Sequence, residues 1–164
     1  MRKVLITLTT LVFLILVSCS NGLSGEEKVA TEFIKSKDYK IVKSLGEPYR
    51  YTLTKDMLAG KTASGGAIQS WCVQSSKPED YFNKEITTYS YEVTNHPMQK
   101  NDSNAKNGVW LNIMMCEGKV IGGTSTPNVD TVGGVFSLEG KTLEEVTGIS
   151  YKEWQDKWRE KYSK

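Results

Sequence analysis

The chain has 164 residues, of which 21 are basic, 19 are acidic and 38% are hydrophobic. This length suits one domain with a substantial core and is short for two domains. Proteins that bind nucleic acid usually have a basic surplus or a basic run, because phosphate neutralisation dominates their affinity. The surplus here is only two charges and there is no basic run, so we expect no nucleic acid partner.

The first 18 residues have the organisation of a secretory signal peptide. Arg2 and Lys3 precede a largely apolar run from Val4 to Val17. A permanent transmembrane helix needs about 20 apolar residues, so this run is too short to span a membrane. We expect residues 1–18 to be removed. The remaining chain would have 19 basic and 19 acidic side chains and would be formally neutral, since the signal contains no acidic residue.

The end of this signal, Leu16-Val17-Ser18-Cys19, resembles the lipobox of bacterial lipoproteins. The resemblance implies that the Cys19 thiol receives a diacylglyceryl group and that the mature chain begins there. Two acyl chains anchor a protein stably, whereas one chain anchors it only marginally. The alternative is an ordinary apolar cysteine within an uncleaved helix. We expect lipid attachment at Cys19, with the protein on the extracytoplasmic face of the cell membrane.

These features divide the chain into a signal peptide at 1–18, a lipidated tether at 19–25 and a single domain at 26–164. Cys72 and Cys116 are then an even pair outside the cytoplasm, and a disulfide between them is one possibility. We favour two buried free thiols, because a domain of this size builds a core without disulfides.

The domain begins with a predicted helix over 25–37. Ser24 and Glu27 have the spacing of a capping box, and the apolar residues that follow share one face. Alternating apolar, aromatic and β-branched residues then predict strands. The expected strands are 39–44, 49–54, 67–75, 85–95, 109–116, 119–124 and 132–138. The segment 67–75 fits a helix as well as a strand, and we favour the strand.

The segments between the strands have their own signatures. Residues 55–66 and 99–108 predict loops, the second exposed and without an apolar anchor, and Pro78 starts a single helical turn. In 49–54 we expect Tyr49, Tyr51 and Leu53 to form a buried face.

The segment 109–116 is apolar on both faces and should be a central strand. Only Asn112 interrupts its apolar character. Glu117-Gly118 then predicts a two-residue hairpin turn.

The C-terminal part is predicted to be helical. Thr142 with Glu145 and Ser150 with Glu153 form two further capping boxes, and Gly148 should end the first helix. An aromatic stripe follows at helical spacing, formed by Tyr151, Trp154, Trp158 and Tyr162. The stripe could bind a partner or stack on cell-wall sugars, but we expect it to dock the helix on its own sheet. The chain as a whole predicts an α+β fold, with an antiparallel sheet of about five to seven strands between an N-terminal and a C-terminal helix.

Three motifs in the second half resemble a family of small extracytoplasmic lipoproteins from Gram-positive, spore-forming bacteria. The motifs are Tyr89-Ser90-Tyr91-Glu92-Val93-Thr94-Asn95-His96-Pro97, Gly118-Lys119-Val120-Ile121-Gly122-Gly123 and Leu138-Glu139-Gly140-Lys141-Thr142-Leu143-Glu144-Glu145-Val146-Thr147-Gly148. The resemblance covers about residues 80–150. It implies a lipoprotein domain with no assigned activity and offers no catalytic residues.

The sequence contains no strong catalytic motif. His96 is its one histidine, and beside Pro97 we expect it in an exposed turn. A zinc site or a Ser or Cys hydrolase would need further partners that no local spacing supplies. We therefore expect no catalytic, cofactor or metal residues. The predicted function is a lipid-anchored binding or interaction module, with an envelope protein as a possible partner. The alternative is a cell-envelope enzyme or enzyme inhibitor.

Overall fold

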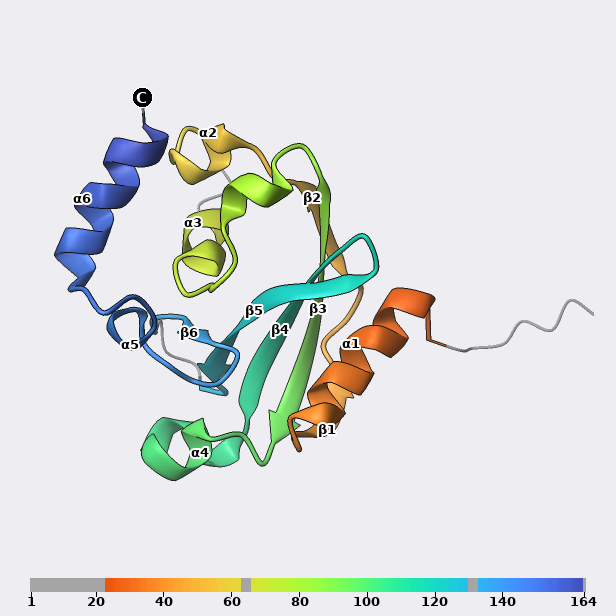
Figure 1. The fold of residues 1–164 in the computed structure, drawn as a ribbon. Helices are drawn as coiled ribbons and strands as arrows, with labels where there is room; N and C mark the ends of the chain where they lie inside the picture. The colour runs from red at the N-terminus through yellow and green to blue at the C-terminus, as the bar shows by residue number, and fades with distance from the viewer. Residues whose placement is uncertain (1–22, 63–65, 130–132, 164) are drawn as a thin grey trace, which may run out of the picture.

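The computed structural model describes residues 23–62, 66–129 and 133–163, and in these it has an α+β fold around a six-stranded antiparallel sheet. Helix α1 (Gly25–Ser36) lies on one face of the sheet. Helices α2 (Lys55–Leu58), α3 (Gly66–Trp71) and α6 (Tyr151–Tyr162) lie on the opposite side (Figure 1). The predicted fold class and both flanking helices are confirmed. The signal peptide at 1–18 and Cys19 lie outside the described residues.

The strands form a sheet with the order β1-β3-β4-β5-β6. Strand β2 pairs with β3 on the same edge as β1, because β4 occupies the other side of β3. The strands are β1 (Lys40–Ser44), β2 (Tyr49–Thr52), β3 (Glu85–Thr94), β4 (Val109–Cys116), β5 (Lys119–Pro127) and β6 (Phe136–Ser137). The predicted central strand is confirmed as β4. The predicted hairpin after it is also confirmed, since Glu117 and Gly118 both have positive φ, at 51° and 73°.

Several short helical segments connect the strands. They are the 3₁₀ turns η1 (Pro78–Tyr81) and η2 (Ser103–Asn107) and the α-helices α4 (Met98–Asn101) and α5 (Leu143–Thr147). Helix α5 begins with the complete predicted capping box, and Gly148 ends it in a left-handed conformation. The starts of α1 and α6 contain half of such a box, with Ser24 and Ser150 each accepting a backbone N–H.

Four predictions about local structure are wrong. Residues 67–75 do not form a strand, because α3 places Ala67 and Trp71 one helical turn apart on a buried side. Residues 55–66 are not wholly a loop, since α2 starts at the Thr54 cap. The segment 99–108 has an apolar anchor after all, because the small side chain of Ala105 is completely buried. The strand predicted at 132–138 is only the two residues of β6.

The expected buried face of β2 is also incorrect in part. Tyr49 is 61% exposed, and only Leu53, just beyond the strand, is fully buried. The reason is that β2 is an edge strand, so its end near Tyr49 has neighbours on one side only.

The core lies on both faces of the sheet. On the face under α1, Ala30 and Ile34 pack with residues such as Tyr91 and Ile113. On the other face, Trp71 and Tyr162 belong to a cluster that also includes Ile86 and Met114 of the sheet. This arrangement explains why β4 is apolar on both faces. Among the residues that the structure describes, no helix is long and apolar enough to cross a membrane.

The aromatic stripe of α6 is largely buried, as expected. Trp154 is 9% exposed and Tyr162 is 2% exposed, whereas Tyr151 at the start of the stripe is 55% exposed. Trp158 donates a hydrogen bond from Nε1 to the carbonyl oxygen of Leu58, at 2.8 Å. The stripe therefore packs mainly on α2 and α5, and only its end near Tyr162 shares a cluster with sheet residues. The prediction that it docks α6 on the sheet is thus confirmed only in part.

Side chains cover the outer edge of β5, where β6 pairs only with Thr124 and Ser125. The Gln74 amide donates to the Gly123 carbonyl at 2.8 Å and accepts from the Gly123 N–H at 2.9 Å. Ser76 Oγ donates to the carbonyl oxygen of Ile121 at 2.9 Å. A Cβ on Gly123 would lie 2.1 Å from the carbonyl oxygen of Asn112, so the close approach of β4 and β5 there requires glycine.

We expect Gln74→Ala to lower the free energy of unfolding by about 1–3 kcal/mol, because both Gly123 backbone groups lose their partner. Urea unfolding of the purified chain measures the change. Gln69→Ala is the matched control, since Gln69 is exposed on α3, just before Gln74 in the chain, and its replacement should change stability little. Equal stability of the two variants would contradict the role assigned to Gln74.

Candidate functional site

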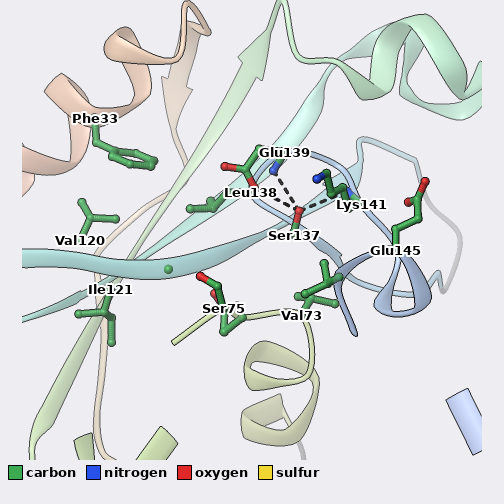
Figure 2. A pocket seen from close by; sticks show the side chains of 13 residues that line it. Phe33, Val73, Ser75, Val120, Ile121, Ser137, Leu138, Glu139, Lys141 and Glu145 are labelled. Atoms are coloured by element: carbon green, nitrogen blue, oxygen red, sulfur yellow. Dashed lines mark hydrogen bonds between the residues drawn. The ribbon is translucent and has the colours of Figure 1, made fainter. Parts of the chain in front are cut away.

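A first hollow of about 420 Å³ opens beside the outer edge of β5 (Figure 2). Phe33, Val120 and Ile121 line its apolar side. Glu139 and Lys141 come from the turn after β6, and Glu145 comes from α5. The mixture of charges makes this hollow a candidate for a polar ligand. Whether its charged groups are available to a ligand depends on the contacts they already make within the protein.

The carboxylates of this hollow already hold local structure. Glu139 pairs with Lys37 at 3.2 Å. Ser137 Oγ accepts hydrogen bonds from the N–H groups of Glu139 and Lys141, each at 3.2 Å, which closes the turn drawn in Figure 2. Glu145 accepts from the Thr142 N–H at 2.8 Å as part of the capping box of α5. These contacts account for the carboxylates without a ligand.

A second hollow, of about 350 Å³, lies on the sheet face opposite α1. We call it the sheet-face groove. Its floor includes Ser90, Asn112 and Thr124, which stand opposite one another on β3, β4 and β5. Ser90 Oγ donates to Asn112 Oδ1 at 2.7 Å, and Asn112 Nδ2 donates to Thr124 Oγ1 at 3.2 Å. The three side chains therefore form one hydrogen-bonded row across the sheet, the polar row.

Two tyrosines of β2 form one wall of the groove. The rings of Tyr49 and Tyr51 are stacked, with centroids 5.6 Å apart and planes inclined by 27°. Trp71 Nε1 donates to the Tyr51 hydroxyl at 3.1 Å, which fixes the Tyr51 ring. Burial raises the pKa of Tyr51, so its hydroxyl keeps its proton at neutral pH. Met57 of α2 and the start of α3 complete the lining.

The groove contains no acidic or basic side chain among the described residues that line it. The next row along the strands contains the ion pair of Lys43 and Glu92, whose charged atoms are 3.1 Å apart. Trp110 stands opposite Glu92 in that row and is half-buried. Trp110 does not line the groove and belongs to a separate hollow with Thr126 and Phe136.

His96 is not the exposed turn residue that was predicted. It is 1% exposed, and both of its ring nitrogens are hydrogen-bonded. Nε2 lies 2.9 Å from the Leu138 carbonyl oxygen, and Nδ1 accepts from the Met98 N–H at 3.2 Å, which places the proton on Nε2. The turn after β6 covers the ring, with Gly140 close to its edge. These contacts tie two distant segments together and leave neither nitrogen for use as a base.

The two cysteines of the domain are free thiols in separate clusters. Cys116 is buried beside Met114, whereas Cys72 packs beside Leu143 and donates to the Gln69 carbonyl at 3.1 Å. Burial raises the pKa of Cys72 to about 11 and also raises the pKa of Cys116. Neither thiol is activated as a nucleophile. The described part of the chain contains no cluster of three or more His, Cys, Asp or Glu side chains placed to bind a metal ion.

Comparisons with known protein families, with curated proteins and with solved structures find no match for this chain. The assignment of a candidate site therefore depends on the geometry of this structure alone. The sequence-based interpretation did not single out the polar row. The one available signal was Asn112, which interrupts an otherwise apolar central strand, but its partners Ser90 and Thr124 become visible only with the register of the sheet.

The buried environment of His96 predicts a pH dependence that can be measured directly, because it is the only histidine of the chain. Desolvation by burial is the largest influence and lowers the pKa of His96 below 6.5, although the Leu138 carbonyl and Glu139 oppose the shift. The unfolded chain then binds the proton more readily. The stability that His96 contributes is complete above pH 6.5 and is lost as the pH falls through the folded-state pKa.

The expected result in a proton NMR titration is a single histidine ring signal that titrates below 6.5 in the folded chain and near 6.5 in urea. A folded-state pKa at or above 6.5 would show that the ring is exposed to solvent or paired with a carboxylate.

Proposed function

We propose that this protein is a lipid-anchored binding module on the extracytoplasmic face of the cell membrane, and that the sheet-face groove holds its ligand. The observation that supports this proposal is the polar row at the centre of the sheet, of which Ser90 and Asn112 are partly exposed and Thr124 is buried. Apolar clusters under α1 and under α2, α3 and α6 cover much of both faces, yet Ser90 and Asn112 remain accessible beside the exposed Tyr49. Concave sites with a few convergent polar groups are the usual form of a ligand site.

The anchor places this groove close to the membrane surface. If the mature chain starts at Cys19, only a short tether precedes α1 at Gly25. Six residues extend over at most about 20 Å, so the domain would stay within reach of the lipid headgroups and the innermost cell wall. A ligand would therefore come from the envelope.

The alternative function as a cell-envelope enzyme has lost its main candidate residue. His96 was the only histidine available as a base, and its two ring nitrogens hold the turn after β6. The carboxylates of the first hollow serve an ion pair, a turn and a helix cap. A binding module needs no such group, which is why we prefer it.

Cys19→Ala should abolish lipid attachment, because the thiol is the acceptor in the proposed reaction. The measurement is metabolic labelling of growing cells with an alkyne fatty acid. The chain is then purified and the label attached to it is quantified. Cys72→Ala is the matched control and should keep the full label, since Cys72 lies within the folded domain. Equal labelling of wild type and Cys19→Ala would remove the anchor from the proposal.

Occupation of the groove in the envelope should protect Tyr49 from nitration by tetranitromethane. Tyr49 and Tyr151 are similarly exposed, at 61% and 55%, but only Tyr49 lines the groove. We expect Tyr49 to be nitrated several-fold less in intact cells than in the purified chain, with Tyr151 equally reactive in both. Mass spectrometry of the two tyrosine peptides gives the ratio. Equal reactivity of Tyr49 in both samples would contradict a ligand in the groove.

A further inference from the structure

We infer that the ligand of the sheet-face groove is a neutral saccharide. This inference rests on the proposed function, since it names the chemical class that the same site would bind. Three properties of the groove support it: the absence of charged side chains among its described lining residues, the row of hydroxyl and amide groups on its floor, and the stacked tyrosine rings of its wall.

The charge of the lining favours an uncharged ligand. A charged group that leaves water for a partly enclosed site needs an opposite charge or several strong hydrogen bonds to compensate for the lost hydration. The nearest row supplies only Lys43 and Glu92, which already neutralise each other at 3.1 Å. Anionic and cationic ligands would both lack a counter-charge on the floor.

The polar row offers hydrogen bonds of the kind that sugar hydroxyls form. Because Thr124 Oγ1 accepts from Asn112, its own proton remains available to donate. Asn112 keeps a second N–H, and Ser90 keeps its acceptor lone pairs. The hydroxyls of Ser70 and Thr88 also line the groove and have no hydrogen-bond partner among the described residues. Donors and acceptors therefore alternate along the floor, which matches a ring whose hydroxyls both donate and accept.

The aromatic side chains suit the apolar faces of a sugar ring. The stacked Tyr49 and Tyr51 present an apolar surface beside the polar row, and the hydrogen bond from Trp71 holds the Tyr51 ring in place. Aromatic rings provide a large apolar contact at a small cost in conformational entropy.

An extended peptide fits the groove less well than a saccharide. Peptides that bind to sheets usually pair with the backbone of a free strand edge. The groove lies over the middle of the sheet face, where β3, β4 and β5 already pair with one another. A peptide there would leave its own backbone groups to the few side chains of the polar row.

The test is a calorimetric titration of the full-length chain in detergent micelles with three trisaccharides. Two are neutral, chitotriose (the N-acetylglucosamine trimer) and maltotriose, and the third, trigalacturonate, is anionic. We expect at least one neutral trisaccharide to bind and trigalacturonate to bind at least about tenfold more weakly. Equal or tighter binding of trigalacturonate would overturn the inference, as would the absence of binding by both neutral probes.

Two variants locate the binding in the groove. Tyr49→Ala should weaken the neutral trisaccharide about tenfold through the loss of the aromatic surface. Tyr151→Ala is the matched control, since Tyr151 is also exposed and also stacks on a neighbouring aromatic ring, and it should leave affinity unchanged. Asn112→Asp keeps the side-chain size and adds a negative charge to the floor, and should likewise weaken binding. Equal loss in both tyrosine variants would place the sugar outside the groove.

The nitration experiment separates this inference from the proposed function. Protection of Tyr49 in cells without binding of either neutral trisaccharide would retain the binding module and reject the saccharide. Absence of both protection and binding would reject both proposals.

Discussion

Burial of β4 on both faces is the constraint on which the rest of the structure depends. The strand pairs with β3 on one side and with β5 on the other. Its side chains alternate between the cluster under α1, with Ile113, and the cluster under α2, α3 and α6, with Met114. A shift of one residue in the pairing would exchange these two sets and expose both. Because the core fixes this register, it also decides which side chains stand opposite Asn112.

Elements whose signal is local could be predicted from the sequence. The alternation in β3, the hairpin at Glu117-Gly118 and the Thr142 capping box are each contained within a few neighbouring residues. Features that depend on contacts between distant residues could not be predicted from the sequence. The burial of His96 requires the turn around Leu138, and α3 is too short for its periodicity to distinguish a helix from a strand.

The polar row shows the same limit at the candidate site. Ser90 and Thr124 are ordinary residues for the outer face of a strand, and neither stands out in the sequence. They become a site only because the sheet aligns them with Asn112 and because α2, α3 and β2 leave that position open. A polar side chain such as Asn112, at the centre of a sheet with a core on both faces, replaces apolar packing that would stabilise the fold. Its presence there indicates a role in function and not in stability.

The cover that Gln74 and Ser76 place over the edge of β5 has a consequence for the membrane attachment that we propose. Lipid anchoring confines copies of a protein to two dimensions, where neighbouring copies meet far more often than in solution. An open strand edge under such crowding would template pairing between copies and lead to aggregation. Two side chains from a loop occupy the Gly123 and Ile121 backbone groups that such pairing would use. With the proposed anchor in place, copies crowded on a bilayer would not join through this edge.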